Sequence, residues 1–213
     1  MEDSPMIKAA GMIIAGILFF FSLSSGQSIN IYRKGTPTVF PLSEVDSITF
    51  TPALPGNVLS LRIDMDEVSG WNEEPDGFRE FHSLEHLAAI MNGGAEMYYQ
   101  RGVVEGFVQY MSKSGTEYAV ESRIMDFAGT ENAENMYLFR RENASTVDSA
   151  GNFSQNDAFI DPDASLTGCC GYAHFGKYYI EVFLSGFSSN KTEACSNASS
   201  FIEVFKMKID AFD

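Results

Sequence analysis

The order of periodic segments between residues 58 and 213 is the feature that most constrains the fold of this chain. Apolar residues recur there at strand-like and helix-like spacings in turn. The pattern predicts helices at 77–91, 130–141 and 191–211, and strands at 58–63, 95–100, 103–111, 117–127, 158–160, 166–175 and 177–184. We therefore expect an α+β domain with a single antiparallel sheet, in which helices lie before, between and after two three-strand units and a pseudo-repeat is conceivable.

Local signals support several of these boundaries. In the helix predicted at 77–91, Phe81, Leu84, Leu87 and Met91 fall on one side at a spacing of 3.6 residues. The following Asn-Gly-Gly, residues 92–94, is typical of a left-handed helix end. The polar segment at 143–157 predicts a surface loop between the two strand groups.

The first 26 residues predict a secretory signal peptide. Lys8 precedes an apolar run from Met12 to Phe21, and the small residues Ser24, Ser25 and Gly26 follow it. The run is about half of the ~20 apolar residues that a bilayer crossing requires, so an uncleaved anchor is the weaker alternative. We expect export to the periplasm, the cell surface or the exterior, with membrane association only if this segment stays attached.

Residues 27–57 read as an appendage and a linker. Alternation from Ile29, the turn sequence at 34–37 and the apolar residues up to Phe50 predict a β-hairpin, and the Pro- and Gly-containing stretch 51–56 predicts a linker to the domain at 58–213. The segment FPLSEVDSITF, residues 40–50, resembles a short segment that follows the signal peptide in many exported proteins of anaerobic Gram-negative bacteria. That resemblance implies a lineage and a context, and no chemistry.

A second resemblance covers residues 70–213. It rests on Gly70-Trp71, on the NGGAE sequence at 92–96, on Glu131-Asn132-Ala133 with Met136, Tyr137 and Arg140, and on the GKYY sequence at 176–179. In this order these motifs resemble an uncharacterised domain family of exported bacterial proteins. The resemblance implies a fold and an extracytoplasmic location, and it implies no activity.

Composition excludes several classes of function. The formal net charge is −15, which disfavours binding to nucleic acids and to anionic lipid surfaces. With 45% hydrophobic and 13% aromatic residues the chain is expected to fold around a packed core. In an oxidising compartment a disulfide from Cys169 or Cys170 to Cys195 is expected, because adjacent strand residues point to opposite faces and only one of the two can reach the last helix.

The string His82-Ser83-Leu84-Glu85-His86 is the sharpest catalytic pattern, because H-x-x-E-H is the inverted zinc-protease signature. It provides an alternative function, a zinc-dependent hydrolase with His82 and His86 as ligands, Glu85 as base and His174 as a conceivable third ligand. Helical geometry places the two histidines and Glu85 roughly opposite Leu84 and Met91, on the face that should meet solvent. An exposed polar face is therefore the competing interpretation.

Three weaker patterns remain. Cys170 and His174 share one strand face but are too far apart for direct contact as a thiol nucleophile and its base. Glu105 and Glu121 could pair as carboxylates for glycoside hydrolysis. Two acidic groups are compared with calcium loops, Asp64, Asp66 and Glu67 in one and Asp157, Asp161 and Asp163 in the other, but neither follows the twelve-residue loop pattern.

The sequence therefore favours an exported, non-catalytic α+β module without a cofactor, which binds a small ligand, a polysaccharide or a partner protein. The aromatic residues Tyr98, Tyr99, Tyr110, Tyr178 and Tyr179 form the candidate binding surface, although packing in the core would account for them equally well.

Overall fold

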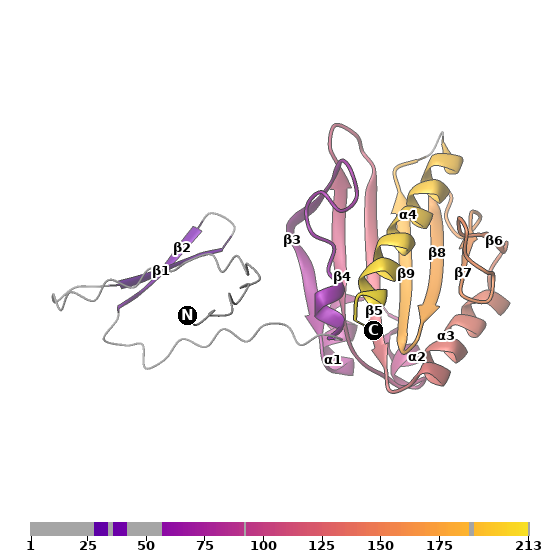
Figure 1. Ribbon diagram of the computed structural model, residues 1–213, viewed down its shortest axis with the longest axis horizontal. Coiled ribbons are helices and arrows are strands. Elements are labelled where there is room, and N and C mark those ends of the chain that lie inside the picture. Colours follow the sequence, from indigo (N-terminus) through magenta and orange to yellow (C-terminus); the bar gives the residue numbers. More distant parts are fainter. Residues whose placement is uncertain (1–27, 34–35, 42–56, 92, 188–189, 213) are drawn as a thin grey trace, which may run out of the picture. The chain divides into compact units, whose positions relative to one another are not determined.

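The computed structural model describes residues 28–33, 36–41, 57–91, 93–187 and 190–212 (Figure 1). The chain divides into two compact units, residues 1–50 and 51–213. In the first unit β1 (Ser28–Arg33) pairs antiparallel with β2 (Thr36–Pro41). The predicted leader, the turn residues 34 and 35, and the continuation of the hairpin and linker at 42–56 lie outside the described residues.

One antiparallel sheet of seven strands, in the order β3-β4-β5-β9-β8-β7-β6, forms the second unit. The strands are β3 (Trp71–Phe81), β4 (Val103–Lys113), β5 (Ala119–Phe127), β6 (Asp148–Ser149), β7 (Ala158–Asp161), β8 (Cys169–Phe175) and β9 (Tyr178–Ser185). The helices are the 3-10 helix η2 (Val58–Leu61), α1 (Leu84–Ile90), α2 (Ala95–Tyr99), α3 (Thr130–Glu142) and α4 (Lys191–Asp210). The predicted α+β class with a single antiparallel sheet is confirmed.

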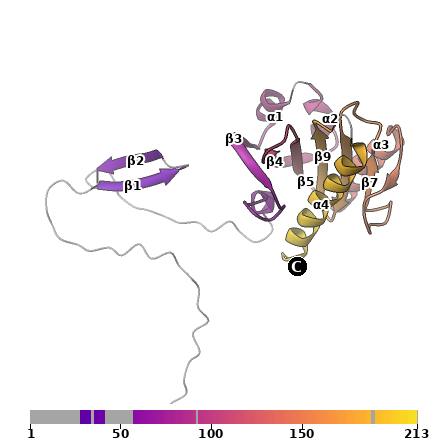
Figure 2. The ribbon, with the colours of Figure 1, turned by 90° about the horizontal axis from the view of Figure 1, so that it is seen from above.

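The long helix α4 lies across one face of the sheet, which we call the α4 face (Figures 1 and 2). Alternate strand side chains such as Phe107, Ile124 and Ile180 point to this face and pack with Phe201 and Phe205 of α4. The 3-10 helix η2 contributes to the same core. No helix among the described residues is long and apolar enough to cross a membrane.

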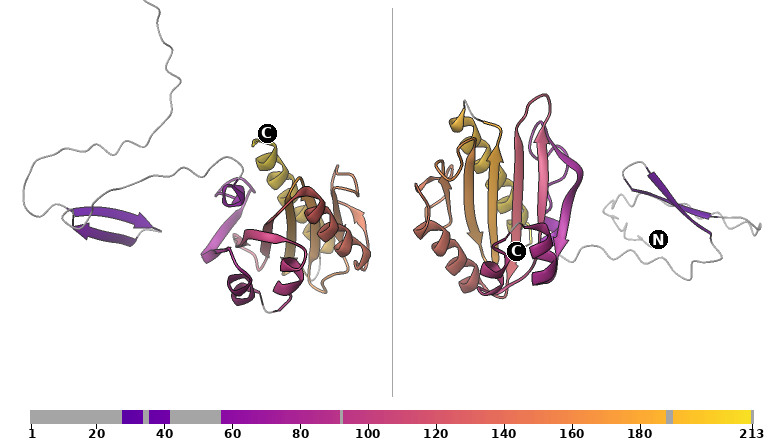
Figure 3. Two further views of the ribbon diagram at one scale, coloured as in Figure 1. Left: turned by 90° about the horizontal axis from the view of Figure 1, so that it is seen from below. Right: turned by 180° about the vertical axis from the view of Figure 1, so that it is seen from behind.

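The opposite face, which we call the α3 face, carries α1, α2 and α3 (Figures 2 and 3). Its core contains Tyr98 of α2, Met136 and Tyr137 of α3, and Met125 and Tyr179 from the strands. Since α3 packs chiefly on β8, β9 and β5 while α1 and α2 lie at the β3–β4 side, the helices leave part of this face open.

The predicted pseudo-repeat holds for the strands and fails for the helices. Strands β3 to β5 precede α3, strands β7 to β9 precede α4, and the two groups meet where β5 pairs antiparallel with β9. A two-fold axis between antiparallel strands would keep both helices on one face, whereas α3 and α4 lie on opposite faces. The helix expected before the first three strands is also misplaced, because α1 and α2 lie between β3 and β4.

The helix predicted at 77–91 is wrong over its first part. Residues 77–81 end β3, where Phe81 is fully buried opposite Gly106 of β4. A Cβ atom at position 106 would lie 2.6 Å from the Phe81 ring, so the glycine makes room for this pairing. The helix begins at Leu84, after the Ser83 hydroxyl accepts a hydrogen bond from the His86 backbone N–H at 3.2 Å.

Two predicted strands are also wrong. Residues 95–99 form α2, which follows Gly94 in the left-handed conformation (φ +82°) and buries Ala95 and Tyr98, three residues apart. Residues 58–61 form η2, whose first turn is capped by Asn57. Gln109 of β4 then holds the chain at Ile63, accepting from its N–H at 3.1 Å and donating to its carbonyl at 2.8 Å.

Candidate ligand-binding groove

Two cavities lie on the open part of the α3 face. The first, which we call the arginine cavity, has a volume of about 460 Å³. Its lining combines two cations with apolar side chains from around α2 and includes Met91, Met97, Tyr98, Arg123 and Arg140. Because these side chains come from α2, β5 and α3, the cavity exists only in the folded sheet.

The second, which we call the aromatic cavity, has a volume of about 440 Å³. Tyr172 and Cys170 of β8 and Phe183 of β9 line it, and Ala164 and Ser165 of the β7–β8 connection form part of its wall. Tyr110 and Glu121, which are opposite one another in the β4–β5 register, line both cavities. The two cavities therefore adjoin, and we refer to them together as the groove.

Glu181 of β9 lies beneath the arginine cavity and binds both of its arginines. Its carboxylate is fully buried and accepts hydrogen bonds from the hydroxyls of Tyr98 and Tyr179, both at 2.8 Å. Arg140 Nε donates to it at 2.9 Å and Arg123 Nη1 at 3.2 Å. A buried carboxylate is costly unless it is paired and hydrogen-bonded, and these four donors meet that requirement.

The two arginines are held by several partners. Arg123 Nε donates to Glu121 at 2.6 Å, and Arg140 Nη2 donates to the Tyr98 hydroxyl at 2.5 Å. Burial acts to lower the pKa of both guanidinium groups, but the neighbouring acidic groups, of which Glu181 has the largest effect, together outweigh burial and raise the pKa. Burial, followed by the Glu181 charge, raises the pKa of Tyr98. Both arginines therefore stay charged, and Tyr98 stays protonated.

Guanidinium groups lie over aromatic rings along the groove. The Arg123 guanidinium carbon is 4.4 Å from the centre of the Phe183 ring, and that of Arg140 is 5.6 Å from the centre of the Tyr98 ring. At the β3 side, Arg79 lies 5.8 Å from the centre of the Tyr110 ring. Cation–π contacts of this kind fix the planes of the guanidinium groups and restrict their rotamers.

Cys170 is a free, buried thiol at the floor of the aromatic cavity. Burial raises its pKa to about 12, so it is protonated at neutral pH and is a poor nucleophile. His174, the base considered from the sequence, has its Nε2 atom 2.8 Å from the Asn156 carbonyl oxygen. This arrangement contradicts a Cys170–His174 nucleophile and base.

The structure does not bring the five predicted tyrosines together. Tyr98 and Tyr110 line the groove, and Tyr179 lies buried beneath it on Glu181. Tyr178 packs in the core of the α4 face and lines a separate cavity of about 710 Å³. Tyr99 is half-buried against the core of the α3 face. Only Tyr98 and Tyr110 therefore belong to a common candidate site.

The H-x-x-E-H string does not form the helical pair that zinc ligation assumes. His82 precedes the Ser83 cap and lies outside α1, whereas Glu85 and His86 lie within it. The His82 Nδ1 atom lies 3.1 Å from Glu105, and its Nε2 atom 3.7 Å from Glu80. Within the described part of the chain, no group of three histidine, cysteine or acidic residues, His174 included, is placed to hold a metal ion.

The pairing of Glu105 with Glu121 for glycoside hydrolysis is excluded by the sheet register. Glu105 lies opposite Asp126 of β5, five residues from Glu121 on that strand. At about 3.3 Å per residue, the backbone positions of the two residues are separated by roughly 16 Å along the strands, too far for the ~5–9.5 Å between carboxylates that glycosidases use.

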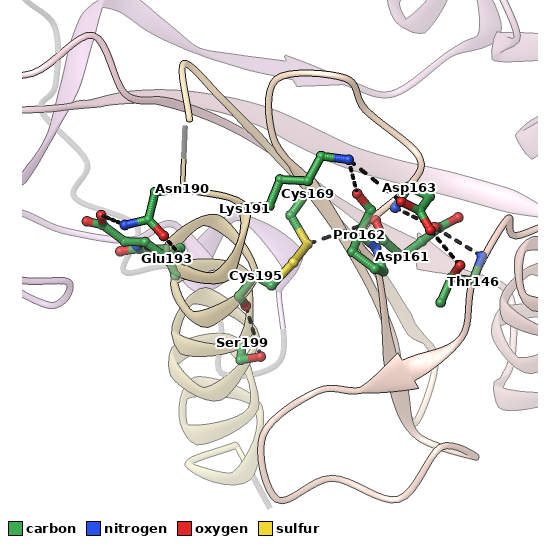
Figure 4. Close-up of a disulfide and its surroundings, with 11 residues drawn as sticks. Thr146, Asp161, Pro162, Asp163, Cys169, Asn190, Lys191, Glu193, Cys195 and Ser199 are labelled. Carbon is green, nitrogen blue, oxygen red and sulfur yellow. Dashed lines mark hydrogen bonds and ion pairs between the residues drawn. A yellow bond between two sulfur atoms is a disulfide. The ribbon is translucent and has the colours of Figure 1, made fainter. Parts of the chain in front are cut away.

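The acidic residues considered for calcium are engaged in local structure. Asp161 accepts backbone N–H groups from Ser145, Thr146 and Asp163 at 2.8, 3.2 and 3.0 Å. Asp163 accepts from the Thr146 hydroxyl and lies 3.6 Å from Lys191, as Figure 4 shows. Glu67, in the other group, is bound to Lys208 at 2.8 Å. These carboxylates therefore stabilise loops and helix ends through contacts within the protein.

A disulfide joins Cys169 of β8 to Cys195 of α4, with 5.3 Å between the Cα atoms (Figure 4). Cys169 points to the α4 face and Cys170 to the α3 face. The alternation of side chains along a strand therefore decides which of the two adjacent cysteines can reach the helix.

The sequence did not indicate that Glu181, Arg123, Arg140 and Phe183 belong to a binding site. A signal was present for Glu181, which is the single charged residue in the apolar run Tyr178–Leu184 and therefore had to find a buried partner. Nothing local indicates that Arg140, which is 41 positions away on a helix, is that partner.

No family model and no curated protein matches the chain. Among solved structures, the extracellular domain of PknH from Mycobacterium tuberculosis is similar to this chain with a TM-score of 0.46 and 13% sequence identity. That similarity covers 73% of this chain and 98% of the PknH domain.

Proposed function

We propose that this protein is an exported, non-catalytic module that binds a ligand in the groove on the α3 face. The observation that carries this proposal is the pair of adjoining cavities, about 460 and 440 Å³ in volume, which share Tyr110 and Glu121. Ligand sites are typically preformed clefts of about 300–1,000 Å³ with apolar walls and a few fixed polar groups. The export part of the proposal rests on the N-terminal sequence at residues 6–26.

The charged groups of the groove support binding in preference to catalysis. Glu181 and Glu121 are both paired with arginines, so neither carboxylate is placed as a free base. The Cys170 thiol is protonated because burial raises its pKa to about 12. Fixed, charged arginines beside an apolar slot are suited to orienting a ligand.

A fluorescent label at the rim tests the proposal. The Ser165→Cys variant is labelled with an environment-sensitive maleimide dye, while the buried Cys170 thiol remains unmodified. The labelled protein is titrated with amino acids, carboxylic acids, amines and oligosaccharides. We expect at least one compound to change the emission of this dye and to leave unchanged the same dye at Met207→Cys, which is 63% exposed on α4.

Emission at position 165 that no compound changes would contradict binding in the groove. Equal changes at positions 165 and 207 would do so as well, because they would reflect a general effect on the dye or on the fold.

A further inference from the structure

The arginine cavity contains hydrogen-bonding groups that the protein does not use. Arg140 donates from Nε and Nη2, and Arg123 donates from Nε and Nη1. Within the described residues, Nη1 of Arg140 and Nη2 of Arg123 therefore have no acceptor. Glu121 accepts through Oε1, and its Oε2 is likewise without a donor among these residues. Both kinds of unused group belong to side chains that line the cavity.

The charges of the site already balance. Arg123 and Arg140 carry two positive charges, and Glu121 and Glu181 carry two negative ones. Near Tyr110, Arg79 and Glu74 add one charge of each sign. A simple anion would leave the site with one excess negative charge, and a simple cation with one excess positive charge. An uncompensated charge in a partly buried site is poorly stabilised, so this imbalance disfavours both. A ligand with one charge of each sign keeps the site neutral.

The groups also follow a spatial order along the groove. The two arginines line only the arginine cavity, Glu121 and Tyr110 line both cavities, and Phe183 and Tyr172 line only the aromatic cavity. A ligand that matches this order carries a carboxylate, then an ammonium group, then an apolar group. An α-amino acid joins these three groups at one carbon atom.

We propose that the groove binds a free α-amino acid with a large apolar or aromatic side chain, an inference that rests on the proposed binding function. The carboxylate binds to the unused guanidinium N–H groups of Arg123 and Arg140, and the ammonium group binds to Glu121. The side chain enters the aromatic cavity and contacts Phe183 and Tyr172. Glu181 acts as a positioning residue, because it holds both arginines without touching the ligand.

Calorimetric titration with four ligands tests this assignment. L-Phenylalanine carries all three groups, 3-phenylpropionate lacks the ammonium group, phenethylamine lacks the carboxylate, and glycine lacks the side chain. We expect phenylalanine, leucine or tryptophan to bind, and each analogue that lacks one group to bind at least about tenfold more weakly, which is ~1.4 kcal/mol. Equal binding of 3-phenylpropionate and phenylalanine would contradict the assignment of a zwitterionic ligand. The absence of binding by all three amino acids at millimolar concentration would contradict it as well.

The variant Glu121→Gln tests whether Glu121 binds the ammonium group of the ligand. It keeps the shape of the side chain, and we expect it to weaken amino acid binding at least about tenfold while leaving the affinity for 3-phenylpropionate unreduced. The matched control is Glu131→Gln, an exposed glutamate on α3 outside the groove, which should bind like the wild type. Melting temperatures of both variants confirm folding, and a Glu121→Gln protein that binds phenylalanine normally would contradict the assignment.

Failure of this inference is distinguishable from failure of the proposed function. If the dye at position 165 responds to compounds of another class while all three amino acids fail to bind, the groove is a binding site and the ligand class is wrong. If the dye responds to nothing, the binding function itself is contradicted.

Discussion

Glu181 shows how one buried charge can define a site. Its side chain has no exposed surface, yet it lies in the middle of the apolar strand β9. Removing one partner of a buried ion pair generally costs more than the pair contributes, because the other charge is left unpaired in a medium of low dielectric constant. Here two arginines depend on the same carboxylate.

We therefore expect Glu181→Gln to lower the free energy of unfolding by about 3–5 kcal/mol, measured by urea denaturation at pH 7. Glu121→Gln is the matched control, because it removes a partner of Arg123 that is partly exposed, and it should therefore cost less than Glu181→Gln. Equal stabilities of the two variants would show that Glu181 is not the organising charge.

At the scale of elements, α4 is joined to the sheet both by packing and by a covalent bond. Its first turn is capped by Asn190, whose side chain accepts from the Glu193 N–H at 3.1 Å, and Cys195 lies in the next turn. Further along, Ala198, Phe201 and Phe205 are fully buried on the α4 face. The disulfide thus fixes the beginning of the helix, while the apolar residues hold the rest.

The disulfide spans 26 positions, and a crosslink of that length is expected to stabilise the fold by about 3 kcal/mol. We expect Cys195→Ser to lower the melting temperature, and dithiothreitol to lower that of the wild type but not that of the variant. The same response of both proteins to the reductant would mean that the bond does not contribute.

At the scale of the whole molecule, buried tyrosines couple stability to alkaline pH. Burial raises the pKa of Tyr98, Tyr172 and Tyr179 above the ordinary value of 10.0. In the unfolded chain these hydroxyls lose their protons above pH 10, whereas in the folded protein they keep them. Unfolding therefore releases protons in this range, and the stability present below pH 10 is lost as the pH rises.

These three groups alone predict that the free energy of unfolding falls by at least about 4 kcal/mol per pH unit well above pH 10, and buried Tyr137, whose pKa burial also raises, adds to the slope. Urea denaturation in steps between pH 9 and about 11 measures this slope. Absorbance of tyrosinate in the folded protein provides the control, because the three buried hydroxyls should not ionise with the exposed ones. A stability that is constant across this range would contradict the burial of these side chains.

How much of the fold could be predicted depends on the range of the interactions that form each element. Strands β4, β5 and β9 and helices α3 and α4 lie close to their predicted positions, because apolar periodicity is a local property of the backbone. Residues 77–81 and 95–99 were assigned to the wrong element, because their apolar residues fit more than one period and contacts with distant residues decide between them.

The class of the fold, with one antiparallel sheet packed between helices, was determined by the sequence through these local periods. The groove was decided by tertiary structure alone. Glu181, Arg123 and Arg140 come together because β9 pairs with β5 and because α3 crosses the sheet above them. Ion pairs between residues far apart in the chain, such as Glu181 and Arg140, leave no periodic pattern in the sequence. Only the packing of the sheet and its helices shows which charged residues meet.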